Sequence, residues 1–312
     1  MDIELRSKVD LFSENYKEIR RVLRWDGKRI NIIEALLNNR TDKEIDLEKL
    51  KKIRGYLEVE ESEKNIFSRR FSNIFSLLID ESKDYKKVFQ DTVTIYEHLT
   101  SKGFLENEAT LFSAFMLSNR FYGQELDNRI IKTIDIKYAF KGDNYISYTL
   151  LATGDKSIDT IMDEFNTISD NIKKAGNYGE EIINNLTFSL ILEDKEVVKK
   201  VEKVLDILCN IKSEIGILRS EVYSMLGITS TLIKNPMNFS KEIKDVFDRL
   251  NKKRFFKYFM KKELKIMISI GIVLNMYIEE VKADLIDISF NDKINMYLAL
   301  EECLVFTICD IN

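Results

Sequence analysis

Apolar residues recur along this chain at intervals of three and four positions, which is the spacing of one face of an α-helix. Two such stripes are long and carry lysine, glutamate and aspartate at the intervening positions. They comprise Ile158, Ile161, Met162, Phe165, Ile168 and Ile172, and Val197, Val198, Val201, Val204, Leu205, Leu208 and Ile211. The alternation typical of β-strands is absent over any useful length. The pattern therefore predicts an all-α protein.

The predicted helices come in pairs, and the pairs repeat about every 35 to 41 residues, the size of a two-helix repeat. Amphipathic helices stop near Gly103, Gly176 and Gly216, and a glycine just past a helix commonly takes the left-handed conformation that ends it. We predict a stack of antiparallel helical hairpins, an α-solenoid-like array, between residues 67 and 281. Residues 123–138 are its least regular part.

Three more helices are predicted before the array, near residues 4–24, 28–39 and 46–58. Thr41-Asp42-Lys43-Glu44 is a capping-box pattern that leads into the third helix. The polar stretch Glu60–Lys64 is the best candidate for a linker.

These features divide the chain into an N-terminal helical segment (1–63), the hairpin array (64–282) and a C-terminal capping helix (283–312), joined in one continuous structural unit. The composition agrees with helix, because Pro236 is the single proline and 11 glycines are too few for an all-β protein of this size. The formal net charge of −4 argues against a whole-protein preference for nucleic acid or anionic membranes.

The sequence predicts a cytoplasmic protein. No basic region followed by an apolar stretch opens the chain, so no signal peptide is expected. The most apolar run, Ile266–Tyr277, is shorter than the roughly 20 residues of a membrane span and contains Asn275, which favours a buried helix. The cysteines lack metal-site spacing and fit buried thiols in a reducing compartment. They are Cys209, Cys303 and Cys309.

The first hundred residues carry a recognisable set of motifs. These are Trp25-Asp26, Ala35-Leu36-Leu37, Ile45-Asp46-Leu47-Glu48-Lys49-Leu50, Phe67-Ser68 with Arg70, Leu77-Leu78, and Tyr96-x-x-Leu99-x-x-x-Gly103-Phe104. In these residues the chain resembles a bacterial family, the domain of unknown function 4003 family. The similarity continues as hydrophobic pattern and repeat rhythm to about residue 282. The resemblance implies an all-helical protein and brings neither an activity nor a site residue with it.

Signals for catalysis are sparse. The single histidine, His98, excludes histidine-rich metal sites and is predicted to lie at an exposed helix position beside Leu99. The sequence has no GxxxxGK[ST], GxGxxG or GxSxG motif. We therefore expect neither nucleotide hydrolysis nor α/β-hydrolase chemistry, and no cofactor.

One group of acids leaves an enzymatic alternative open. Asp159 and Asp163, with Glu164, share a helix face, and Mg²⁺ takes carboxylate oxygens as ligands. The spacing is not DDxxD, and no second acidic motif matches it. We favour the interpretation that these acids lie on a solvated face near the helix N-terminus, where they interact well with the helix dipole. Whether they bind a metal stays open.

Residues 252–262 interleave six basic residues with four aromatic ones. On a continuous helix, Arg254, Lys257 and Lys261 would align on one side and the aromatic residues on another. A surface of this kind binds phosphates, an acidic partner or a membrane, and the candidate binding residues are Arg254, Lys257, Tyr258 and Lys261. We favour the alternative that the segment is a hairpin turn, with aromatic rings packed inward and lysines extending along the surface.

A smaller basic cluster, Arg20, Arg21 and Arg24, lies in the first predicted helix, where Glu18 and Asp26 are expected to compensate it. Three functions follow, in order of preference. The first is a non-enzymatic helical repeat scaffold that binds a protein or peptide on a concave surface. The second is an all-α enzyme with a carboxylate site, and the third is a binder of nucleic acid or an anionic membrane surface through residues 252–262.

Overall fold

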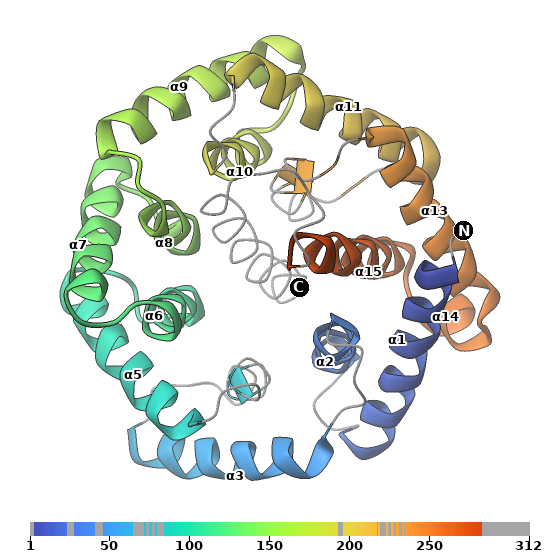
Figure 1. The fold of residues 1–312 in the computed structure, drawn as a ribbon, viewed down its shortest axis with the longest axis horizontal. Coiled ribbons are helices and arrows are strands. Elements are labelled where there is room, and N and C mark those ends of the chain that lie inside the picture. The colour runs from blue at the N-terminus through green and yellow to red at the C-terminus, as the bar shows by residue number, and fades with distance from the viewer. Residues whose placement is uncertain are drawn as a thin grey trace. The chain divides into compact units, whose positions relative to one another are not determined.

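Every regular element that the structure describes is an α-helix (Figure 1). The structure is a computed structural model, and it describes the continuous ranges 3–23, 28–40, 46–64, 84–192, 196–216 and 235–282, with single positions between 72 and 79 and between 218 and 233. No β-strand occurs among these residues. The prediction of an all-α protein is confirmed.

The helices follow the amphipathic segments of the sequence closely. They are α1 (Ile3–Val22), α2 (Lys28–Arg40), α3 (Leu47–Lys64), α5 (Tyr85–Ser101), α6 (Glu108–Arg120), α7 (Gly123–Phe140), α8 (Tyr145–Thr153), α9 (Ile158–Ala175), α10 (Glu180–Ile191), α11 (Val197–Ile215), α13 (Pro236–Lys252), α14 (Arg254–Phe259) and α15 (Lys262–Lys282).

The chain divides into two compact units, residues 1–45 with 164–312 and residues 46–163. The second boundary falls inside α9. The division expected from the sequence, after residues 63 and 282, is a different one and stays a prediction. The expected capping helix in 283–312 lies outside the described residues.

In the unit of residues 46–163, α5 packs against α6, α7 packs against α8, and α6 packs against α8. Every residue from Thr110 to Ser118 of α6 is buried, whereas α5 and α7 keep one face exposed. A hydrogen bond of 2.9 Å between the hydroxyls of Thr92 and Ser118 ties α5 to α6. The buried Ser118 hydroxyl of α6 is therefore satisfied by its neighbour α5, while α5 and α7 carry the solvated surface.

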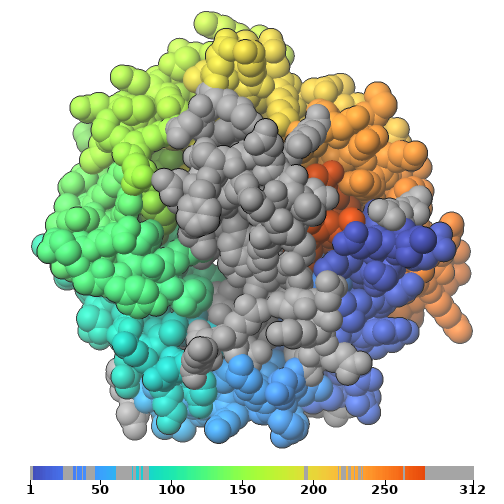
Figure 2. Space-filling view, viewed as in Figure 1, coloured from blue at the N-terminus to red at the C-terminus, as the bar shows by residue number. Residues whose placement is uncertain are grey.

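In the other unit, the first helices of the chain pack against the last described ones. Helix α1 contacts α13 and α15, and α2 contacts α15, so the surfaces of α1 and α13 adjoin in Figure 2. The Asn275 side-chain amide of α15 donates to the Leu36 carbonyl of α2 at 3.0 Å, in a fully buried position. An open array in which each repeat contacts only its sequence neighbours does not predict this contact.

Helix ends agree with the sequence in part. Gly103 follows α5 with a φ angle of 81°, which fits the predicted left-handed stop. Gly216 caps α11 with φ 107° and ψ −158°, so its φ is positive but its conformation is not left-handed helical. Gly176 directly follows α9, but its φ is not positive, so the expectation of a left-handed stop is wrong there. Residues 123–138, expected to be irregular, lie within the continuous helix α7.

The predicted linker is also wrong. Residues 60–64 form the end of α3, which runs through Lys64. The capping box at 41–44 lies outside the described residues. Helix α3 is instead capped by Asp46, whose carboxylate accepts a hydrogen bond of 3.0 Å from the Lys49 backbone N–H.

The apolar run in α15 is a buried helix, as predicted. All residues from Ile266 to Asn275 are buried. No helix in the described ranges has both the length and the apolarity that crossing a membrane requires.

Candidate functional site

The basic-aromatic segment 252–262 is broken into three pieces. Helix α13 ends at Lys252, and Lys253 is extended with φ −80° and ψ 121°. The six residues of α14 follow, and then Met260 is again extended, with φ −125° and ψ 129°. The alignment expected on one continuous helix is therefore wrong. Arg254 and Lys257 lie in α14, while Lys261 lies in the connection to α15.

Two of the four aromatic side chains anchor α14 against α1. Phe256 is 1% exposed, and its ring centroid lies 5.6 Å from that of Tyr16 and 5.9 Å from that of Phe12. Phe255 is half-buried and packs on Tyr16 at 5.4 Å. The Arg20 guanidinium of α1 lies 4.5 Å from the Phe255 centroid. The expectation of inward packing is confirmed for this pair.

The other two aromatic side chains face solvent. Tyr258 is 67% exposed and Phe259 is 62% exposed, so the expectation of inward packing is wrong for both. Exposed aromatic side chains of this size in adjacent positions are characteristic of contact surfaces.

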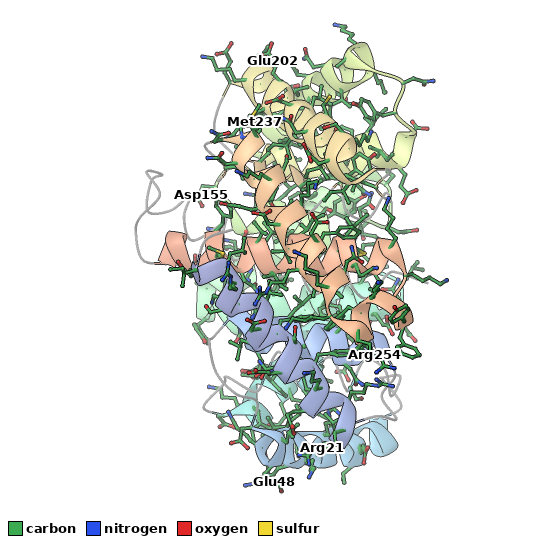
Figure 3. The ribbon with its side chains drawn as sticks, turned by 90° about the vertical axis from the view of Figure 1, so that its right-hand side faces the viewer. Arg21, Glu48, Asp155, Glu202, Met237 and Arg254 are labelled. Carbon is green, nitrogen blue, oxygen red and sulfur yellow. The ribbon has the colours of Figure 1, made fainter. Side chains whose placement is uncertain are left out.

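Together with three cations, these two rings line an open hollow of about 620 Å³, made by Lys252, Arg254, Lys257, Tyr258 and Phe259. We call these five residues the α14 surface. Arg254 is labelled in the side view, at the right-hand side of the ribbon (Figure 3). Lys252, Arg254 and Lys257 are exposed, and none forms an ion pair with a residue that the structure describes. No acidic residue is among the lining residues.

Three of the four binding residues expected from the sequence belong to this surface. Arg254, Lys257 and Tyr258 line the hollow, whereas the exposed Lys261 does not. The sequence reasoning did not identify Lys252 and Phe259. Both lie in the segment it singled out, but the break at Lys253 changes which side chains share a face.

Lys253, next to this surface, is not available to a ligand because it is paired with Asp10. Asp10 of α1 accepts hydrogen bonds from Arg249 of α13 at 2.5 Å and from Lys253 at 2.8 Å. Burial by itself would raise the pKa of Asp10, but the hydrogen bonds and charges of Lys253 and Arg249 outweigh it and hold that pKa below its ordinary value.

The arginine cluster of α1 is only partly the compensated surface expected. Arg21 pairs with Glu18 at 2.7 Å, as predicted. Arg20 instead contacts Phe255, a residue far away in sequence, and so takes part in holding α14. Arg24 lies outside the described residues.

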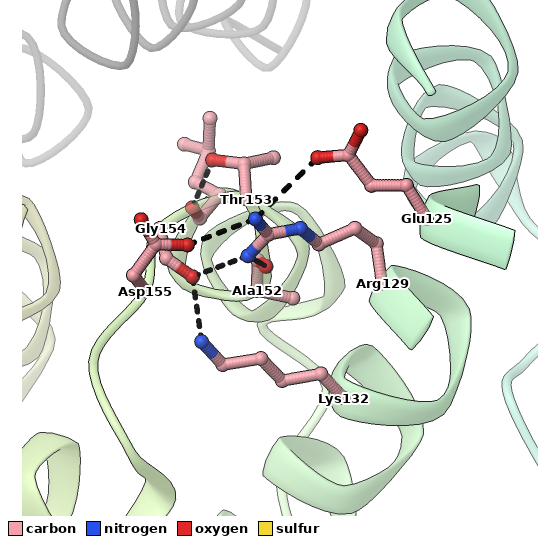
Figure 4. A network of polar contacts seen from close by, with 8 residues as sticks. Glu125, Arg129, Lys132, Ala152, Thr153, Gly154 and Asp155 are labelled. Carbon is pink, nitrogen blue, oxygen red and sulfur yellow. Dashed lines mark hydrogen bonds and ion pairs between the residues drawn. The ribbon is translucent and has the colours of Figure 1, made fainter. Parts of the chain in front are cut away.

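A second cationic cluster, in the unit of residues 46–163, is fully engaged within the protein (Figure 4). Arg129 of α7 donates to the carbonyls of Ala152 at 3.1 Å and Gly154 at 2.6 Å, and pairs with Asp155 at 2.9 Å. Lys132 donates to the same Gly154 carbonyl at 2.6 Å. The pKa of Lys132 is lowered, mainly because the side chain is partly buried and also because the Arg129 charge lies nearby. These cations satisfy the carbonyls at the C-terminus of α8, which is a structural role.

The acids of α9 do not form a ligand cluster. Asp159 and Asp163 are exposed, and Glu164 pairs with the buried Lys200 of α11 at 3.2 Å. In the part of the chain that the structure describes, no three His, Cys, Asp or Glu side chains gather closely enough to hold a metal ion. His98 is exposed beside the buried Leu99, as predicted.

Cys209 is exposed, so the expectation of a buried thiol is wrong for this residue; Cys303 and Cys309 lie outside the described residues.

Fold and site together define an all-helical protein with an exposed basic-aromatic surface. The chain belongs to the family described as "Protein of unknown function (DUF4003)", which it matches over residues 15–303. This confirms the resemblance seen in the first hundred residues and extends it over most of the chain. Neither a curated protein nor a solved structure matches the chain.

Proposed function

We propose that this protein acts by binding rather than by catalysis, as a cytoplasmic scaffold of stacked antiparallel helical hairpins that holds a protein or peptide partner. We further propose that the α14 surface is part of the contact. The pairing of α5 with α6 and of α7 with α8 supports the hairpin arrangement. Helical repeats of this kind present extended surfaces to protein segments.

The observation that carries the proposal is the composition of the α14 surface. Three cations without an ion pair among the described residues surround two aromatic rings that are 67% and 62% exposed. Aromatic side chains and arginine are enriched at protein contact surfaces, and the two lysines add positive charge beside them. The partner that complements this charge is an acidic segment.

The test removes the three positive charges of the α14 surface by substitutions that should not disturb the fold. The triple variant Lys252→Gln, Arg254→Gln and Lys257→Gln should melt within a few degrees of the wild type, because exposed charges contribute little to stability. Its affinity for a fluorescein-labelled polyglutamate peptide, measured by anisotropy at low ionic strength, should fall by about tenfold or more.

A matched control distinguishes the effect of the α14 surface from the effect of a change in net charge. Lys102→Gln, Lys173→Gln and Lys174→Gln remove the same number of exposed positive charges elsewhere. This control should bind polyglutamate as the wild type does. An equal loss of affinity in both variants, or no binding by the wild type, would contradict the proposal.

A further inference from the structure

The aromatic half of the α14 surface is held from below. Phe259 stacks on Phe255 with centroids 5.6 Å apart and an interplanar angle of 19°. Phe255 is itself fixed by Tyr16 at 5.4 Å and by the Arg20 guanidinium at 4.5 Å. The exposed ring of Phe259 thus belongs to a stack that is rooted in α1. When a ligand covers this ring, the protein loses little conformational entropy, because the ring is already held in place.

The cationic half is available to a ligand. Lys253, between α13 and α14, is already paired with Asp10, whereas Lys252, Arg254 and Lys257 keep their charges in solvent. Lys257 Nζ lies 5.2 Å from the Tyr258 ring centroid, so a cation and an exposed ring are immediate neighbours. An anionic group that reaches the cations therefore also brings its adjoining atoms close to an aromatic ring.

The size and layout of the hollow favour a compact ligand. The hollow is open, and all five of its lining residues lie between positions 252 and 259 of the chain, so the surface they offer is small. A nucleic-acid strand is bound by cations that track along its backbone over several nucleotides, together with aromatic rings that stack on its bases, and a bilayer is bound by cations spread across a plane. Here the three cations share one hollow with two rings, on a chain whose net charge is −4.

We propose that the α14 surface binds an acidic protein segment that carries an aromatic residue between carboxylates. The aromatic side chain packs on Tyr258 and Phe259, and the aspartates or glutamates on either side of it pair with Lys252, Arg254 and Lys257. This inference rests on the proposed function, because it names the chemistry of the segment that the scaffold binds.

Two labelled peptides test it, a glutamate-rich peptide with a central phenylalanine and the same peptide with alanine in that place. At low ionic strength the wild type should bind the phenylalanine peptide about three- to tenfold more tightly, the range expected for one aromatic contact. Phe259→Ala should abolish this preference and leave the affinity for the alanine peptide nearly unchanged.

The folding of the variant is checked by its melting temperature, which should change little because Phe259 is mostly exposed. Tyr122→Ala is the matched control. It removes an aromatic side chain that is 71% exposed at the start of α7, and it should keep the preference.

The outcomes separate this inference from the proposed function. Equal affinity for both peptides overturns the aromatic specificity and leaves the acidic partner in place. If the wild type binds neither peptide, both proposals fail. Capture of anionic phospholipid vesicles or of polyuridylic acid in that case assigns the surface to a membrane or to RNA.

Discussion

Asp10 joins the N-terminal helix to the end of α13, because one carboxylate accepts hydrogen bonds from both Arg249 and Lys253. Its pKa is held below the ordinary value of about 3.8 by these two cations, against the opposing effect of burial. A carboxyl group whose pKa is lower in the folded chain than in the unfolded chain stabilises the fold above the unfolded pKa. That contribution is lost as the pH falls through the folded-state pKa.

We therefore expect Asp10→Asn to lower the free energy of unfolding at neutral pH by about 1 kcal/mol or less, since the pair is partly exposed and screened. The difference from the wild type should shrink below about pH 3.8 and disappear once the wild-type carboxyl group is protonated. Urea unfolding at a series of pH values measures it. A difference that is constant down to acid pH would rule out the ion pairs as its cause.

Single residues also mark how far the sequence can define the site. The interleaving of basic and aromatic residues in 252–262 is visible in the sequence, and three of the predicted residues line the hollow. Which aromatic residues are buried is not visible, because that depends on the extended residues Lys253 and Met260 on either side of α14. These two breaks rotate the short helix relative to its neighbours and place Phe256, rather than Phe259, in the core.

At the level of elements, the amphipathic stripes predicted most of the helices. The stripe of α11 runs from Val197 to Ile211, and within it Val204 is fully buried. Val198, which the same spacing assigned to the stripe, is 46% exposed. At 3.6 residues per turn, Val198 lies about 120° around the helix from Val204, at the flank of the buried face.

These two valines give a matched test of the stripe. Val204→Asp should lower the free energy of unfolding by roughly 3 to 5 kcal/mol, because it buries an unpaired charge among apolar side chains. Val198→Asp, the same substitution six residues earlier in the helix, should change the free energy of unfolding by less than about 1 kcal/mol. The melting temperatures of both variants measure this difference. If Val204→Asp melts at the same temperature as Val198→Asp, the α11 stripe does not lie in the core.

Helix ends were predicted less well than helix interiors. The polar residues 60–64 resemble a linker in composition, yet they continue α3, because glutamate and lysine are good helix formers even where nothing apolar requires a helix. Gly176 ends α9 without a positive φ, so a glycine near a helix end indicates the boundary and not its conformation.

For the whole molecule, the sequence indicates which faces are buried but not what covers them. The stripe of α1 includes Phe12, Tyr16 and Ile19, all essentially inaccessible to solvent. Their partners include Phe255 and Phe256, more than two hundred residues further along the chain. Periodicity within a helix carries no information about such a partner, so the contact between the first and last described helices was not predictable from the pattern.

This contact makes α14 dependent on α1. A six-residue helix is too short to be stable by itself. Tyr16→Ala removes the ring that packs on both Phe255 and Phe256, and it should destabilise the fold by about 3 kcal/mol. Hydrogen exchange should accelerate first in residues 254–260. Exchange in α5 and α6, which belong to the other unit, should change least. Uniform acceleration across both units would contradict this division.

The packing of α1 and α2 against α13 and α15 also bears on how the chain is made. The ribosome releases the N-terminal helices first, and the residues they pack against follow more than two hundred codons later. At ordinary translation rates that interval is on the order of tens of seconds, far longer than helix formation takes. During this time α1 has α2 beside it, but the part of its apolar face that packs on α13, α14 and α15 lacks its native cover on every nascent chain. We therefore expect its first two helices to be a substrate for the chaperones that meet growing chains.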